Sequence, residues 1–423
     1  MQGLPCDLTK QTLHSGSLFS EETTLAQISP LPTWPEKIKA FFGISLQVIG
    51  VVFLARLILD IGTRTVFPFI PQLAAGLGLS VVNFSWLIFI RGIIGMAGPV
   101  FGVWSDRYGR RKMMAVGLLC QTLGVVGLTL SWQWWAVGPM LLFGLGLTAF
   151  IPPQQAYISD QVAYQRRGRA LAIIEASWAV AAIVFLPIIG WLIDNFGWRL
   201  PFLLLGLFSL LGALLVWRYL PPAAHLSQAQ LSWTEMRRLS LRPNVLASIA
   251  VSLLLFVTVD CFISVWGIWL SADYGLEAAA LGLVATGIGL AELAGSGSSS
   301  LFIDHLGKRR GSGLGLLLSA LILLLLPLTQ AVFFLAVATL IAAGALLEFT
   351  IVSLIPLYSE QVPEARGTLF SLVLLGAAIG GALGAPIAAN LWEATGLWGV
   401  CLVAGGCLLG ALGLMGRFLR EGS

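Results

Sequence analysis

The sequence predicts an all-α integral membrane protein of about twelve transmembrane helices, arranged as two pseudo-symmetric six-helix bundles. Hydrophobic residues make up 57% of the 423 positions and charged residues only 10%, with a mean hydropathy of +0.90. Such a chain has too little polar surface to coat a soluble globule. Apolar runs near the roughly 20 residues that a bilayer requires recur along the chain, and its two halves resemble each other.

The apolar runs fall into two groups of six on either side of a polar stretch. The expected spans are 46–70, 82–103, 113–130, 136–157, 169–193, 200–219, 244–271, 279–303, 311–328, 331–356, 368–391 and 397–416. The first residues are polar, rich in Ser, Thr and Pro, and lack the apolar core of a signal peptide. We therefore expect a disordered tail at 1–40, an N-terminal bundle at 41–220, a linker at 221–243 and a C-terminal bundle at 244–423.

Basic residues set the expected orientation. Lys and Arg gather in every second loop, and the loops on the other side share only Arg199. Cytoplasmic loops retain positive charge, so we expect both termini in the cytoplasm. The basic residues are scattered in small groups and form no single stripe, which argues against a nucleic-acid partner.

An internal repeat with an offset of about 198 to 200 residues joins the two halves. The stretch 106–112, read as acid, two residues, glycine and three cations, recurs at 304–310. The stretch 160–162, Asp-Gln-Val, returns as Glu-Gln-Val at 360–362. Six spans in each half give both halves the same orientation, which is the pattern of a parallel repeat.

The loop after the second span carries residues that resemble the signature of the major facilitator superfamily. They are Gly102, Asp106, Arg107, Gly109, Arg110, Arg111 and Lys112, and the second-half copy keeps Asp304 and Gly307. The resemblance implies that this loop acts as a cytoplasmic gate latch, with Asp160 at the end of the fourth helix as a partner. Pro68 and Pro71 at the end of the first span resemble the twelve-span drug:proton antiporter branch. In the fifth span Leu186 stands where the antiporter signature has glycine, which leaves the direction of transport open.

Ionisable residues inside the spans are the main candidates for the substrate and proton cavity. A charge at the bilayer centre costs about 2.5 to 3.5 kcal/mol, so these residues are expected to face a cavity or one another. The set is Arg56, Asp60, Arg64, Arg91, Glu175, Asp260, Glu292 and Glu348. The first three are spaced four apart and share one helix face, so Asp60 can pair with either arginine. Asp260 follows Asp60 by 200 positions, which predicts a similar depth in the other bundle.

Burial and a nearby cation move a carboxyl group between its neutral and charged forms, which proton coupling requires. Asp60 is the first candidate for this role, followed by Asp260, Glu292 and Glu348, whereas Glu175 best fits a fixed ion pair near a helix end. The leading hypothesis is a secondary transporter in a bacterial-type plasma membrane that exports small apolar or amphipathic compounds in exchange for protons. It is expected to act as a monomer.

The sequence leaves two other functions open. The intramembrane arginines suggest a transporter of organic or inorganic anions, and a membrane receptor or scaffold without transport is a further alternative. An enzyme is not expected, because the sequence holds no nucleotide-binding loop, metal cluster or nucleophile constellation. The five cysteines lack CxxC spacing and the three histidines lie outside the spans, so no metal or cofactor is expected.

Overall fold

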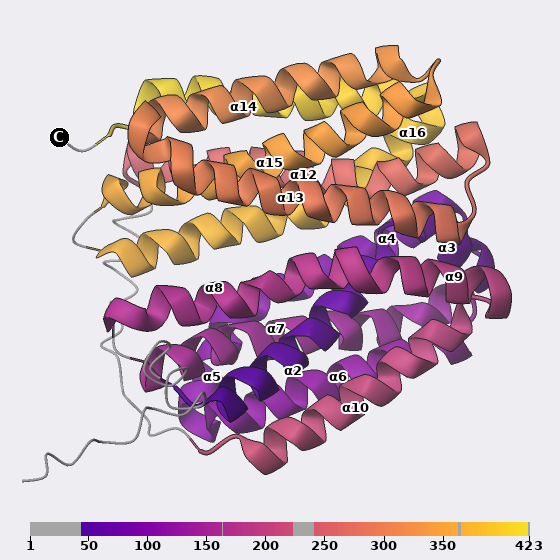
Figure 1. Cartoon of the computed structure of the whole chain (residues 1–423), viewed down its shortest axis with the longest axis vertical. Helices are drawn as coiled ribbons and strands as arrows, with labels where there is room; N and C mark the ends of the chain where they lie inside the picture. The colour runs from indigo at the N-terminus through magenta and orange to yellow at the C-terminus, as the bar shows by residue number, and fades with distance from the viewer. Residues whose placement is uncertain (1–43, 163, 223–240, 363–364, 422–423) are drawn as a thin grey trace, which may run out of the picture.

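The computed structural model describes residues 44–162, 164–222, 241–362 and 365–421. These residues form helices and no β-strand. Figure 1 shows two bundles side by side, one from the indigo-to-magenta half of the chain and one from the orange-to-yellow half. The expected tail at 1–40 and most of the expected linker at 221–243 lie outside the described residues.

The N-terminal bundle begins with α2 and ends with α10. Its elements are α2 Leu46–Val66, α3 Ile70–Leu77, α4 Val81–Ile93, η1 Ile94–Ala97, α5 Gly98–Tyr108, α6 Arg110–Leu130, η2 Gln133–Ala136, α7 Val137–Gln161, α8 Tyr164–Val180, η3 Ala181–Phe185, α9 Leu186–Phe196 and α10 Arg199–Tyr219. Short 3₁₀ and π segments interrupt two of its spans. The second span runs through α4, η1 and α5, and the fifth runs through α8, η3 and α9.

The C-terminal bundle has fewer interruptions. Its elements are α12 Pro243–Tyr274, α13 Ala278–Leu306, α14 Lys308–Leu325, η4 Leu326–Thr329, α15 Phe333–Gln361 and α16 Arg366–Phe418. The last of these contains two helices, because Gly396 has the non-helical angles φ 66° and ψ −155°. Only a glycine adopts this conformation without strain.

Ten helices of the described chain are long and apolar enough to cross a membrane, and a bent pair of helices at 70–97 brings the total to eleven. Dividing α16 at Gly396 gives the twelve spans that the sequence predicts. The first expected span ends earlier than predicted: α2 stops at Val66, and the apolar residues after it form the separate helix α3. A bend of 101° separates α3 from the second span.

The backbone repeats between the two halves. Six glycines of the described chain have positive φ, and they form three pairs with offsets of 197, 198 and 199 residues: Gly78 with Gly275, Gly109 with Gly307, and Gly197 with Gly396. Each pair ends or joins helices at the same place in its half of the chain. The parallel repeat therefore appears in the turns as well as in the charged motifs.

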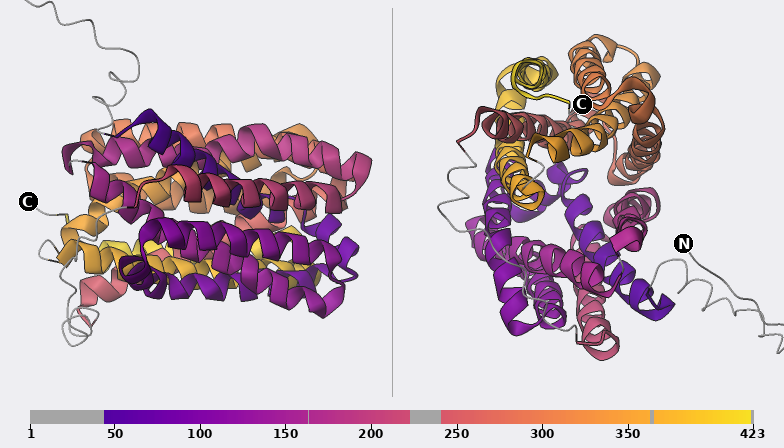
Figure 2. Two further views of the ribbon diagram at one scale, coloured as in Figure 1. Left: turned by 90° about the horizontal axis from the view of Figure 1, so that it is seen from below. Right: turned by 90° about the vertical axis from the view of Figure 1, so that its left-hand side faces the viewer.

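Both described chain ends lie at one end of the molecule, on the left of Figure 1 and of the left-hand view in Figure 2, called here the termini end. Contacts between the bundles extend from the middle of the helices to the opposite, far end. At the far end an ideal Cβ on Gly282 of α13 would lie 2.6 Å from the Leu186 carbonyl oxygen of α9. Near the middle, a Cβ on Gly92 of α4 would lie 2.9 Å from the Ala382 Cβ of α16. These small residues let the bundles approach closely.

The π segment η3 adds a polar contact to this interface. Pro187 has no N–H to donate to the carbonyl four residues before it, which belongs to Ile183. The Thr286 hydroxyl of α13 donates a hydrogen bond of 3.3 Å to that carbonyl from the other bundle. The proline therefore frees a backbone acceptor that the C-terminal bundle uses.

Candidate functional site

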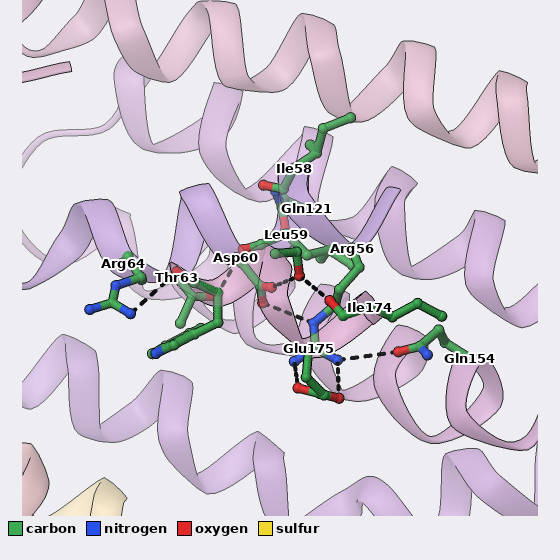
Figure 3. Close-up of polar contacts among 12 residues, drawn as sticks. Arg56, Ile58, Leu59, Asp60, Thr63, Arg64, Gln121, Gln154, Ile174 and Glu175 are labelled. Atoms are coloured by element: carbon green, nitrogen blue, oxygen red, sulfur yellow. Dashed lines mark hydrogen bonds and ion pairs between the residues drawn. The ribbon is translucent and has the colours of Figure 1, made fainter. Parts of the chain in front are cut away.

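Arg56 of α2 is the centre of a polar cluster inside the N-terminal bundle (Figure 3). Its Nε donates to Asp60 Oδ1 at 2.9 Å, and its Nη1 donates to Gln154 Oε1 of α7 at 3.2 Å. Nη1 and Nη2 also bond the two carboxylate oxygens of Glu175 on α8, at 3.2 and 3.1 Å. The planar fork of the guanidinium group thus joins three helices.

Asp60 is almost completely enclosed, with 1% of its surface exposed. Its Oδ1 accepts from Arg56, and its Oδ2 accepts a hydrogen bond of 2.5 Å from the Ser177 hydroxyl. Of the two arginines on its helix face, Asp60 therefore pairs with Arg56 and not with Arg64. Glu175 pairs with the same arginine but keeps 47% of its side chain exposed.

Arg64 forms a salt bridge with a residue of the other bundle. Its Nη1 and Nη2 bond the two oxygens of Glu292 on α13, at 2.8 and 3.0 Å. Nη1 also donates to the Trp178 carbonyl at 3.3 Å, and the guanidinium carbon lies 4.5 Å from the centre of the Trp178 ring. A paired, bidentate arginine of this kind fixes both the distance and the angle between two helices.

Arg91 of α4 is buried, with 7% of its surface exposed, and its guanidinium carbon lies 4.6 Å from the centre of the Phe143 ring. Its Nη1 has no hydrogen-bond partner within the described chain. Asp260 of α12 has the opposite charge and lies within electrostatic range of Arg91. Asp260 packs against α16, where a Cβ on Gly381 would lie 2.8 Å from its Oδ2.

Carboxylates outnumber arginines in this set of eight by five to three. Arg56 forms salt bridges with two of the carboxylates, and Arg64 forms one with a third. Among the described residues, Asp260 and Glu348 accept no hydrogen bond and form no direct ion pair, and Glu348 lies within electrostatic range of Glu292 and Arg64. The interior therefore has an excess of negative charge, which favours binding of protons or cations.

The loop between α5 and α6 forms a second cluster at the termini end. Arg110 Nη1 lies 2.7 Å from Asp160 Oδ2 at the end of α7, and Arg110 Nη2 lies 3.4 Å from Asp106 Oδ1. Arg111 donates a hydrogen bond of 3.0 Å to the Leu220 carbonyl after α10. The turn between α5 and α6 is thereby tied to two further helix ends of its own bundle.

The remaining loop residues have smaller parts in this cluster. Gly109 forms the turn with φ 99°, and the carbonyl of Gly102 accepts a hydrogen bond of 2.7 Å from Ser105. Arg107 is exposed and lies over the Tyr108 ring, with 5.6 Å between its guanidinium carbon and the ring centre.

The second half of the chain repeats the ion pair of the loop between α5 and α6. Gly307 forms the equivalent turn with φ 80°, and Lys308 pairs with Glu360 at the end of α15. Lys308 follows Arg110 by 198 positions and Glu360 follows Asp160 by 200, so the two pairs occupy corresponding places. Asp304 belongs to α13, and its side chain lies outside the described residues.

Three residues that the sequence did not indicate form hydrogen bonds in the cluster or between the bundles. Gln154 and Ser177 complete the Arg56 and Asp60 cluster. Asp194, at the far end of α9, accepts hydrogen bonds from the backbone of α13. Gln154 is polar within an apolar span, which is a usable signal, whereas a serine or a carboxylate near a loop carries none.

Comparison with known proteins gives a family. A model of the Major Facilitator Superfamily matches residues 52–268 and again 249–422. The two matches cover nearly all of the helical part of the chain, one for each half. Among solved structures, the crystal structure of a D-xylose-proton symporter has a TM-score of 0.73 at 16% identity, and covers 89% of this chain and 98% of that one. That likeness shows the fold, and it confirms the predicted two-bundle architecture.

The similar proteins are named as transporters of different kinds. The "Multi-drug resistance efflux pump PmrA" of Streptococcus pneumoniae is 34% identical over 143 residues, 33% of each chain. The "Niacin transporter NiaP" of Acinetobacter baylyi is 31% identical over 132 residues, 30% of each chain. The alignments with these curated relatives thus span about a third of their length. The "Uncharacterized MFS-type transporter YceJ" of Bacillus subtilis is 28% identical over 359 residues, covering 79% of this chain and 87% of that protein.

Proposed function

Because the chain belongs to the Major Facilitator Superfamily, we propose that it is a transporter that exports small apolar or amphipathic compounds in exchange for protons. Membership makes it a multi-span membrane transporter and not an enzyme, as the sequence predicts. The relatives include multidrug efflux pumps and niacin transporters, so substrate and coupling are our own inference.

The excess of carboxylates over arginines carries this proposal. An ionised carboxylate in the membrane interior is costly unless a cation or a proton neutralises it. Three arginines face five carboxylates, and Arg56 and Arg64 already have acidic partners. Proton binding at Asp60, Asp260 or Glu348 removes the surplus charge without a metal ion. An anion would add to it, so the charge balance favours proton coupling over anion transport.

The loop between α5 and α6, which acts as the cytoplasmic gate in this proposal, supports alternating access between two states. The pair formed by Arg110 and Asp160 ties the loop to α7, and such pairs can form in one state and break in the other. We place the loop and both termini on the cytoplasmic side, which the distribution of Lys and Arg favours. The substrate is then taken up from the cytoplasm and released outside.

Dye efflux from cells that lack their own pumps tests the proposal. Efflux of ethidium, a lipophilic cation, should require the chain and stop when an ionophore collapses the proton gradient. Asp60→Asn should reduce efflux to background at equal expression, since an amide cannot release a proton. Asp273→Asn, which changes an exposed carboxylate at the end of α12, should behave like the wild type. Efflux that survives both the ionophore and Asp60→Asn would refute proton coupling through this residue.

A further inference from the structure

Two charge pairs between the bundles occupy corresponding positions in the internal repeat. Arg64 on the first span forms a salt bridge with Glu292 on the eighth. Asp260 on the seventh lies within electrostatic range of Arg91 on the second, without a direct ion pair. Asp260 follows Arg64 by 196 residues and Glu292 follows Arg91 by 201, close to the offset of the repeat. In each pair the first helix of one half meets the second helix of the other half, with the signs of the charges exchanged.

The two pairs lie on different sides of the interface between the bundles. Arg64 and Glu292 lie beside Trp178 on α8, where the fifth and eighth spans meet. Arg91 precedes Gly92, which contacts Ala382 of α16, and Asp260 packs against the neighbouring Gly381. The second pair therefore lies where the second, seventh and eleventh spans meet. Two such contacts on opposite sides oppose rotation of one bundle against the other.

The pairs also differ in whether the two charged groups are in direct contact. Arg64 and Glu292 share two hydrogen bonds, of 2.8 and 3.0 Å, and their side chains are 9% and 13% exposed. Arg91 keeps a buried Nη1 atom without a partner in the described chain, although the opposite charge of Asp260 is within range. The first pair is therefore a direct salt bridge, whereas the second is an electrostatic attraction without a hydrogen bond in the described chain.

We propose that these two pairs together hold the bundles closed toward the far end, and that Glu292 and Asp260 are the carboxylates whose neutralisation releases them. A proton on either carboxylate removes the charge that the arginine attracts. A cationic substrate beside the carboxylate competes with the arginine in the same way. The empty, ionised protein stays locked, while the proton-loaded or substrate-loaded protein can change state, which is the rule that an exchanger must obey. This reading rests on the proposed exchange of substrate for protons.

Cysteine labelling measures the closure without any substrate. The native cysteines are replaced, and Ala278→Cys places a thiol at a fully buried position where α9 meets α13 at the far end. The purified full-length protein in nanodiscs is treated with a maleimide. Glu292→Gln and Asp260→Asn should each raise the labelling rate on the order of tenfold, because each shifts the population toward the open state. Glu175→Gln is the matched control and should leave the rate unchanged, since Glu175 pairs within one bundle.

Exchanging the two charges of a pair distinguishes loss of the ion pair from general damage to the fold. Arg64→Glu should raise labelling, and the double variant Arg64→Glu with Glu292→Arg should restore the low wild-type rate. Lowering the pH should raise labelling of the wild type, and this pH dependence should disappear when Glu292→Gln and Asp260→Asn are combined. The charged groups facing these carboxylates, Arg64 and Glu348 for Glu292 and Arg91 for Asp260, are unchanged in that combination.

Two results would overturn the inference: labelling that stays at the wild-type rate in both neutral variants, or labelling that rises equally in the Glu175→Gln control. Either would mean that the two pairs do not hold the closure. Dye efflux answers the separate question of function. If labelling follows the prediction but efflux does not depend on protons, the proposed function is refuted and the role of the two pairs stands. If efflux is normal but labelling stays constant, the role of the two pairs is refuted and the proposed function stands.

Discussion

The Asp194 carboxylate accepts a hydrogen bond of 3.0 Å from the backbone N–H of Ala278, which belongs to the other bundle. Its second oxygen accepts from the next N–H, that of Ala279, at 2.7 Å. The residue at the N-cap position of α13 is Glu277, whose side chain makes no capping hydrogen bond. The start of α13 is therefore capped by a carboxylate from the opposite bundle, and a negative charge there also suits the helix dipole.

Removing this cap should weaken closure of the far end. A lost N-cap costs about 1 kcal/mol, and a change of this size alters a two-state population about fivefold. Asp194→Ala should therefore raise the labelling of a cysteine at position 278 by that factor. Asn195→Ala provides the control, because the Asn195 side chain donates a hydrogen bond to the Trp191 carbonyl of its own helix. Equal labelling in the two variants would show that the cap does not hold the bundles together.

The fold was predictable because its signals are local or periodic. Long apolar runs specify the spans, and the repeated charges at 106–112 and 304–310 specify the parallel halves. The end of the first span was less predictable, because α3 is as apolar as the span before it and only the bend separates them. Apolar composition alone does not say where a helix turns out of the membrane.

The site was predictable only as a set of residues. The cost of intramembrane charge selected all eight candidates, and the spacing of four placed Asp60 beside Arg56. The choice of Glu292 as the partner of Arg64 was not predictable, since the two are 228 positions apart and belong to different bundles. Such a pairing depends on how two helices pack, which no local pattern specifies.

The pair of Arg110 and Asp160 should be required for transport. Arg110 is 6% exposed and connects the turn at Gly109 to the end of α7. Asp160→Asn removes the charge attraction while it retains the volume, and should reduce efflux on the order of tenfold at equal expression. Lys112→Ala, an exposed cation two residues along the same helix, should have less than a twofold effect. Equal losses of efflux in the two variants would show that the pair of Arg110 and Asp160 has no specific role.

Close packing of α6 and α7 should make one glycine of the N-terminal bundle irreplaceable. A Cβ at Gly124 would lie 2.5 Å from the backbone nitrogen of Phe143 and 2.8 Å from its Cα. Backbone cannot move aside as a side chain can, so Gly124→Ala should destabilise the bundle by about 1 to 3 kcal/mol. Gly138→Ala on α7 meets nothing within 4 Å and should leave the melting temperature unchanged. Thermal unfolding in detergent, followed by tryptophan fluorescence, compares the two variants.

The charge balance around Asp60 can be tested by a double-mutant cycle with Arg56. Arg56→Gln leaves a carboxylate that is 1% exposed without its cation, and removal of one partner from a buried pair costs about 3 to 5 kcal/mol. Asp60→Asn in the same protein removes that uncompensated charge, so the double variant should recover most of the lost melting temperature. The two changes are then strongly non-additive, as expected for groups in direct contact. Additive losses would mean that Arg56 stabilises the fold mainly through Gln154 and Glu175, and that the charge of Asp60 is neutralised in another way.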